Sequence, residues 1–145
     1  MYVRSSLAAA ALGAILLAAT VATGAQTDPN DPLGLGTKLG VQSLNNSGQV
    51  GTITLFRRGA HKTLVDLSIS GVPARKVELA SLRRSRDCTA TIARRVVFAL
   101  ESVRHARSRT LLAATEDSLL SGNYIVLVAS QEKPSHYLAC GHLYR

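Results

Sequence analysis

Apolar and polar residues alternate along two neighbouring segments of the chain, residues 50–55 and 65–69, and the polar stretch 57–62 lies between them. A period of two places every second side chain on the same face of a strand. Because one set of positions is apolar and the other polar in both segments, we predict a β-hairpin with one buried face. Ile53 and Leu67 are typical of that buried face.

Five further segments have the length and apolar content of short strands. They are residues 76–82, 96–100, 110–114, 124–128 and 136–143. In the first of them, the alternation assigns Val77 and Leu79 to the buried face and Glu78 to the exposed face. Residues 83–87 are polar, and we expect them to form a loop.

One helical turn is predicted between the strands, at residues 115–122. Thr115 is a typical N-cap residue, two acids follow it in the first turn, and Gly122 ends the segment. About seven short strands at turn-sized spacing predict an all-β fold, a Greek-key β-barrel or sandwich. The domain is expected to span residues 41–145, after a flexible leader at 26–40 that is rich in glycine, proline and aspartate.

The first 25 residues have the pattern of a secretory signal peptide. Arg4 supplies a short positive region, residues 7–22 are small or apolar without interruption, and small residues lead up to Ala25. The apolar run is short for a membrane span of about 20 residues, although a retained anchor is the alternative interpretation. We therefore expect a cleaved signal peptide and a secreted or periplasmic protein.

The chain contains two cysteines, Cys88 and Cys140. Export carries thiols into an oxidising compartment, where a lone pair of cysteines is expected to form a disulfide. The closed loop has about 50 residues, and the chain-entropy model assigns about 4 kcal/mol of stability to such a loop. We therefore predict a bond between these two residues.

Four short motifs occur in order along the chain. They are SGQVGTITL at 47–55, LSISGVP at 67–73, LLSGNYIVLV at 119–128 and YLACG at 137–141. Together they resemble the exported bacterial CHRD-type domains that are related to Cu,Zn superoxide dismutase. The resemblance covers most of the chain after the signal peptide, and it implies a Greek-key β-domain whose disulfide ends on the last strand.

The same resemblance implies metal-binding histidines that this chain lacks. A His-x-His pair is expected before the first cysteine, but residues 71–88 contain no histidine, and Ala129 occupies another expected histidine position. Because copper redox chemistry needs imidazole ligands, the resemblance supports the fold and argues against dismutase activity. We expect no cofactor and no catalysis, since no nucleophile motif is present either. The alternative is a metal-binding protein or a dismutase-like enzyme with relocated ligands, drawn from His61, His105, His136 and His142.

Positive charge is concentrated in one part of the chain. The formal net charge is +8, and residues 75–109 contain ten Lys or Arg but only three acids. Guanidinium groups bind phosphate, sulfate and carboxylate. If the loops of this region meet at one end of the barrel, their arginines form a patch for anionic polymers or lipid headgroups; a merely solvated basic surface is the alternative. The candidate residues are Arg83, Arg84, Arg86, Arg94, Arg95, Arg104, Arg107 and Arg109. The sequence thus predicts an exported, non-catalytic binding or structural module.

Overall fold

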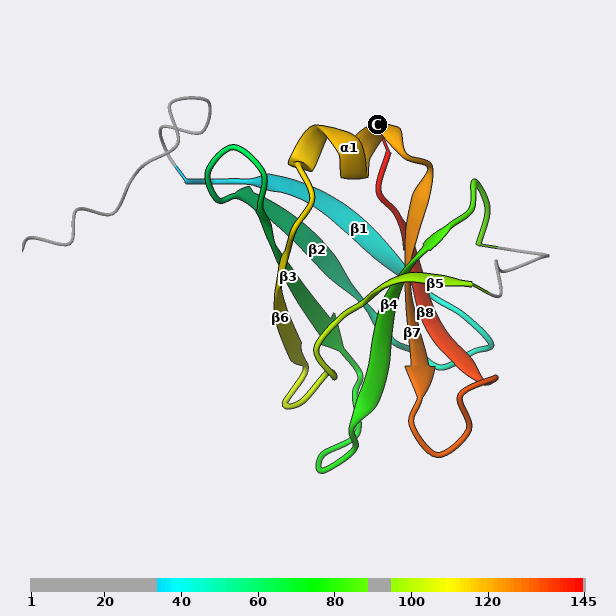
Figure 1. Ribbon diagram of the computed structural model, residues 1–145. Helices are drawn as coiled ribbons and strands as arrows, with labels where there is room; N and C mark the ends of the chain where they lie inside the picture. The colour runs from blue at the N-terminus through cyan, green and yellow to red at the C-terminus, as the bar shows by residue number, and fades with distance from the viewer. Residues whose placement is uncertain (1–33, 89–94, 145) are drawn as a thin grey trace, which may run out of the picture.

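A computed structural model describes residues 34–88 and 95–144, which form eight antiparallel strands and one short helix (Figure 1). The strands are β1 (Thr37–Ser43), β2 (Val50–Arg57), β3 (Thr63–Ser70), β4 (Glu78–Arg84), β5 (Val96–Ala99), β6 (Arg107–Leu112), β7 (Tyr124–Ser130) and β8 (Tyr137–His142). The helix, α1 (Glu116–Ser121), lies between β6 and β7. The all-β fold class predicted from the sequence is therefore confirmed.

The strands form one sheet in the order β5-β4-β7-β8-β1-β2-β3-β6, which curls into a nearly closed barrel. Three pairs of consecutive strands are not neighbours in the sheet, namely β3 and β4, β5 and β6, and β6 and β7, so three connections cross from one part of the sheet to another. Between the two edge strands, Val103 exchanges backbone hydrogen bonds with Glu78 of β4. The connection from β5 to β6 therefore helps to close the barrel.

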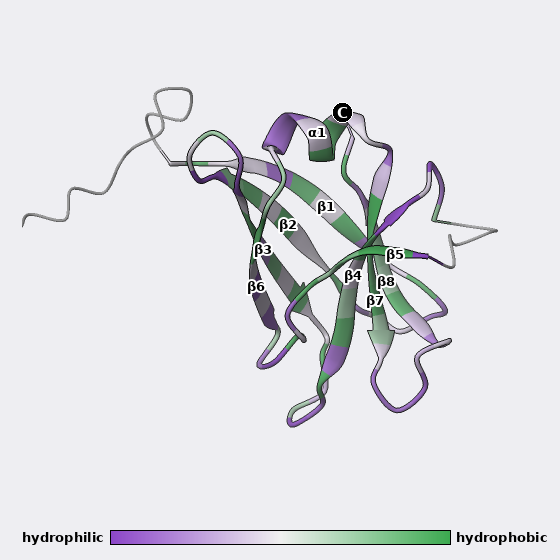
Figure 2. Ribbon diagram, viewed as in Figure 1, coloured by the Kyte–Doolittle hydropathy of each residue, from purple (hydrophilic) through white to green (hydrophobic). Residues whose placement is uncertain are grey.

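The predicted hairpin is formed by β2 and β3. Ile53 pairs with Leu67 and Leu55 pairs with Val65, and all four side chains are buried. The mostly aliphatic core continues along β4 and β7, where Leu82 and the inward-facing valines pack together. Figure 2 shows this hydrophobic content along β7, whereas the loops at the bottom of the view are mostly hydrophilic. The period of two is thus explained by one face of each strand packing inside the barrel.

Strand β7 is buried on both of its faces. Val126 and Val128 belong to the barrel core, whereas Ile125 and Leu127 belong to a second cluster with Cys140, against which Cys88 and Tyr137 pack. The predicted disulfide joins Cys88 to Cys140 across this outer cluster, with the two Cα atoms 6.0 Å apart. A continuous apolar sequence is what a strand covered on both faces requires.

The helix closes the end of the barrel opposite the β3–β4 loop (Figure 1). Oγ1 of Thr115 accepts a hydrogen bond from the backbone N–H of Ser118, so Thr115 is the N-cap as predicted. Leu119 is fully buried in the main core. The capped turn therefore places the side chain of Leu119 in the core at this end of the barrel.

The start of the first strand differs from the sequence prediction. Strand β1 begins at Thr37, four residues before the predicted start of the domain, because Thr37 and Leu39 pair with Leu55 and Ile53 of β2. The signal peptide predicted for residues 1–25 lies outside the described residues, as does most of the predicted leader. Among the helices that the structure describes, none is long and apolar enough to span a membrane.

Strand β4 differs from the prediction in both length and orientation. It continues through Arg83 and Arg84, which were expected in a loop, because these residues pair with β7. Its buried side chains are Glu78, Ala80 and Leu82, whereas Leu79 is exposed. The sequence prediction placed Leu79 on the buried face. The structure buries the other set of positions, because Leu82 belongs to that set and packs in the core.

We predict that removing the disulfide destabilises the domain by about 4 kcal/mol, because the unfolded chain loses a constraint on a loop of roughly 50 residues. Cys88→Ser measured by urea unfolding checks this prediction. Reduction of the unsubstituted protein should cause a similar loss and should leave the variant unaffected. An equal unfolding midpoint before and after reduction would contradict a stabilising role for the bond.

Candidate functional site

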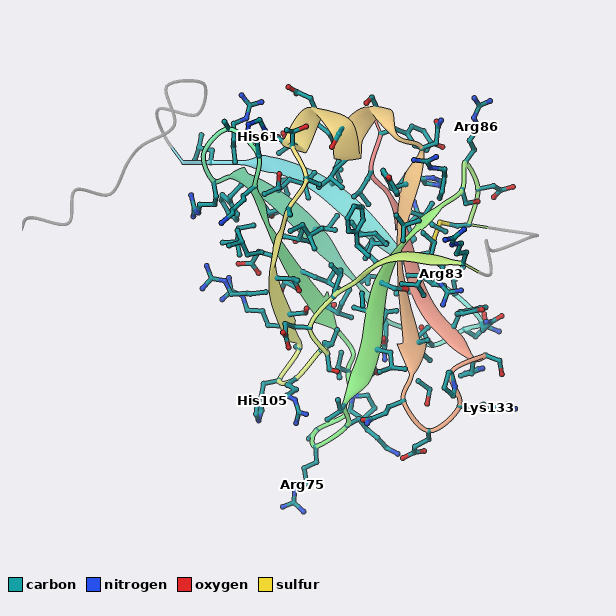
Figure 3. The ribbon with its side chains drawn as sticks, in the orientation of Figure 1. His61, Arg75, Arg83, Arg86, His105 and Lys133 are labelled. Atoms are coloured by element: carbon teal, nitrogen blue, oxygen red, sulfur yellow. A yellow bond between two sulfur atoms is a disulfide. The ribbon has the colours of Figure 1, made fainter. Side chains whose placement is uncertain are left out.

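Four of the eight candidate arginines lie close together at the C-terminal end of β4. Arg83 and Arg84 end the strand, and Arg86 follows in the loop that leads to Cys88. Arg95 directly precedes β5, whose first residue pairs with Arg83. Figure 3 shows Arg83 and Arg86 on the same side of the molecule, near β5. We call Arg83, Arg84, Arg86 and Arg95 the β4–β5 arginine group.

Tyrosines from distant parts of the chain contact these arginines. The Arg84 guanidinium lies 5.4 Å from the centre of the Tyr124 ring and donates a 3.2 Å hydrogen bond to its hydroxyl. The Arg83 guanidinium lies 5.6 Å from the centre of the Tyr137 ring. The hydroxyl of Tyr144 donates to the backbone carbonyl of Arg86. Stacking of this kind holds a guanidinium in place while its remaining N–H groups stay available to a ligand.

Sequence reasoning missed the tyrosines because they lie far along the chain from the arginines. Tyr124 begins β7 and pairs with Arg84 of β4. Tyr137 begins β8 and lies level with Leu79, so the Arg83 side chain reaches it along the outer face of β4. Within the described residues, Arg84 and Arg86 form no ion pair with a carboxylate. The end of the barrel at Arg84 therefore presents positive charge beside Tyr124, whereas the Arg83 guanidinium lies on the outer face of β4 beside Tyr137.

Three other candidate arginines lie elsewhere. Arg107 donates two hydrogen bonds to the carboxylate of Asp66, at 3.0 and 2.9 Å, and Arg109 lies 3.3 Å from the same carboxylate. The hydrogen bonds and the charge of Asp66 raise the pKa of Arg107. The carboxylate of Asp66 thus balances one of the two positive charges of this pair of arginines.

Arg104 lies near the start of β4, because the adjacent Val103 pairs with Glu78. Six residues of extended strand, roughly 20 Å, separate Glu78 from Arg84. The single patch expected from the sequence is therefore divided into two. One part is the β4–β5 arginine group, and the other consists of Arg104, Arg107 and Arg109. Arg94 lies outside the described residues.

The four histidines are dispersed. His61, His105 and His136 are exposed, and Figure 3 shows the first two at opposite ends of the molecule. His142 is half-buried and packs edge-on against Tyr144, with ring centres 4.9 Å apart. Within residues 34–88 and 95–144, no three His, Cys, Asp or Glu side chains gather where they could hold a metal ion.

A second candidate site is a cavity of about 230 Å³ at the end of the barrel that carries the β3–β4 and β7–β8 loops. Gln49 and Glu78 line it, and each is only 3% exposed. Nε2 of Gln49 donates a 2.5 Å hydrogen bond to Oε1 of Glu78. Oε2 of Glu78 and Oε1 of Gln49 are buried without a hydrogen-bond partner among the described residues.

Burial raises the pKa of Glu78 above its ordinary value of 4.5, although the hydrogen bond from Gln49 opposes this effect. Desolvation disfavours the ionised carboxylate. Sequence reasoning missed this residue because it assigned Glu78 to the exposed face of β4. The signal that could have identified it is Leu82, which lies four residues later on the same face.

We predict that Glu78→Gln increases the free energy of unfolding at pH 7.5. A carboxyl whose pKa is raised by folding contributes its full stability below its unfolded pKa, and this contribution falls as the pH rises through the folded pKa. The amide avoids that loss. Urea unfolding should therefore show a larger advantage for the variant at pH 7.5 than at pH 4.0. If the stability difference between Glu78→Gln and the unsubstituted protein did not change with pH, the raised pKa of Glu78 would not be its cause.

Comparisons with protein-family models, with curated proteins and with solved structures found no match to this chain.

Proposed function

We propose that the protein is a non-catalytic binding module for anionic polymers, and that it binds their phosphate or sulfate groups through the β4–β5 arginine group. The observation that carries this proposal is the arrangement of Arg84 and Arg86. Both are exposed, neither is paired with a carboxylate within the described residues, and Tyr124 and Tyr144 contact them. A guanidinium presents a planar set of donors that matches phosphate and sulfate oxygens.

Restraint of the arginines supports binding because a pre-ordered side chain loses less entropy when a ligand arrives. Arg84 is held by its stack on Tyr124, and the backbone of Arg86 is held by Tyr144. The disulfide at Cys88 anchors the same loop two residues later. The site is therefore built on ordered strands and a cross-link.

The second group of arginines is a weaker candidate because of Asp66. This carboxylate, only 7% exposed, is contacted by both Arg107 and Arg109. An incoming anion would have to compete with it for the same guanidinium groups. Binding by the β4–β5 arginine group needs no such exchange at Arg84 or Arg86.

Export remains part of this proposal. Outside the cytoplasm, acidic polysaccharides and other polyanions supply ligands of the required charge. The resemblance to CHRD-type domains, with the expected dismutase ligands missing, supports a role in binding over a role in catalysis. The eight-stranded antiparallel barrel is compatible with that resemblance.

We predict that Arg84→Ala combined with Arg86→Ala lowers the affinity for heparin by about tenfold or more at low salt, since each lost contact contributes roughly 1 kcal/mol. Affinity of the unsubstituted protein should also fall as salt is added. Isothermal titration against heparin at several salt concentrations measures both effects.

The matched control is Arg104→Ala combined with Lys133→Ala, which removes the same charge from exposed positions elsewhere. Equal losses in the two double variants would show diffuse attraction in place of a defined site. Binding to phosphatidylglycerol vesicles without binding to heparin would contradict the proposed polymer ligand and would indicate an anionic membrane surface as the ligand.

A further inference from the structure

Three apolar side chains lie side by side on the outer face of the sheet, next to the β2–β3 loop. Phe56 of β2 pairs with Leu64 of β3, and Leu64 pairs with Leu111 of β6. Residues that pair directly across neighbouring strands place their side chains on the same face. The adjacent residues Leu55 and Val65 are in the core, so this face is the outer one. We call Phe56, Leu64 and Leu111 the outer apolar row.

The outer apolar row is accessible from solution. Leu111 is 54% exposed, and Phe56 and Leu64 are half-buried. Strand β6 is an edge of the sheet, so no further strand among the described residues lies beyond Leu111. Neighbouring exposed apolar side chains with a polar rim are typical of interaction surfaces.

The β2–β3 loop adds positive charge at one side of the row. The Arg58 guanidinium lies 5.6 Å from the centre of the Phe56 ring. The backbone N–H of Arg58 donates a 2.8 Å hydrogen bond to the carbonyl of Lys62 across the loop. Both side chains are exposed. Figure 3 shows His61, which lies in the same loop, on the opposite side of the molecule from Arg86.

The next row of the same face adds positive charge at the other side. Lys38 of β1 pairs with Thr54, Thr54 pairs with Asp66, and Asp66 pairs with Arg109. Lys38 and Arg109 are exposed, whereas the Asp66 carboxylate is contacted by arginines. The outer apolar row therefore lies between two pairs of cations, which we call the basic rim: Lys38, Arg58, Lys62 and Arg109.

A second copy of this chain does not fit the surface. Two copies would bring their basic rims together, and like charges in contact disfavour association. A stable protein interface also buries roughly 800 Å² per partner, with 20 to 30 residues on each side. Three apolar side chains supply only a small part of such an area.

An anionic lipid bilayer matches both parts of the surface. A soluble polyanion would contact the cations but would leave Leu111 in water. A bilayer offers phosphate groups at its surface and an apolar layer directly below them, and binding to it grows with buried apolar area and with attraction to anionic lipids.

We propose that this face of the barrel docks on an anionic lipid bilayer. Leu111 and Phe56 enter the boundary between headgroups and acyl chains, and the basic rim contacts the headgroup phosphates. The stack on Phe56 holds the Arg58 guanidinium close to the apolar row, at the depth where phosphates lie. This surface shares no residue with the β4–β5 arginine group, so it is independent of the polymer-binding proposal.

The test uses the full chain after export and vesicles of phosphatidylglycerol mixed with phosphatidylcholine. Leu111→Ser should weaken co-sedimentation by about tenfold or more, since one leucine no longer leaves water. The matched control is Val50→Ser, at a 48% exposed position at the other end of β2, and it should change the affinity less than about threefold. Pure phosphatidylcholine vesicles should bind more weakly, because they lack the net negative charge.

A fluorescent reporter tests insertion directly. The chain contains no tryptophan, so Leu111→Trp adds a single one. Its emission should shift to the blue with these vesicles and should be quenched by brominated lipid, whereas Val50→Trp should show neither effect. These responses support the proposal, and equal responses at the two positions overturn it.

The remaining outcomes separate this surface from the polymer site. Arg58→Ala combined with Lys62→Ala should weaken vesicle binding by about tenfold. Arg84→Ala combined with Arg86→Ala should weaken heparin binding and leave vesicle binding within about threefold. If only the second pair weakened vesicle binding, or if Leu111→Ser bound vesicles like the unsubstituted protein, the proposed docking face would be wrong. A dimer that forms with rising concentration and is lost in Leu111→Ser would assign the row to a second copy and would also overturn the proposal.

Discussion

The disulfide between Cys88 and Cys140 is the constraint on which the outer half of the structure depends. It joins the loop after β4 to the last strand, over the outer faces of Ile125 and Leu127. The disulfide shares the cover of these two aliphatic side chains with Leu44 and Tyr137. The same bond anchors the loop that carries Arg86, so it contributes both to the packing of β7 and to the position of part of the basic surface.

Strand β4 connects the two candidate sites. Its first residue, Glu78, is buried at one end, and its last residue, Arg84, is exposed at the other. The surroundings of Arg84 and Glu78 differ. Arg84 stacks on Tyr124 and stays accessible, whereas Glu78 keeps one hydrogen bond and has its pKa raised by burial. The two ends of one strand thus hold their charged residues in opposite environments, one exposed and one buried.

Some elements could be predicted from sequence because their signals are local. The β2–β3 hairpin follows from period two around a polar turn, and helix α1 follows from the Thr115 cap, the two acids after it and Gly122. Strand β4 was harder because both of its faces contain leucine and polar residues. Its inward set includes Glu78, a residue that local hydropathy always assigns to the surface. Only contact with the core, through Leu82, decides between the two faces.

Periodicity, cysteine number and charge are properties of the chain, so they were enough to predict the all-β class, the disulfide pair and the basic region after β3. Which charges become neighbours depends on how the strands pair. Strand pairing brought Tyr124 to Arg84, and it separated Arg84 from Arg107, which β6 places beside Asp66 of β3. It also buried Glu78 against Gln49. These contacts join residues about 30 to 40 positions apart, and sequence spacing carries no information about distances set by sheet register.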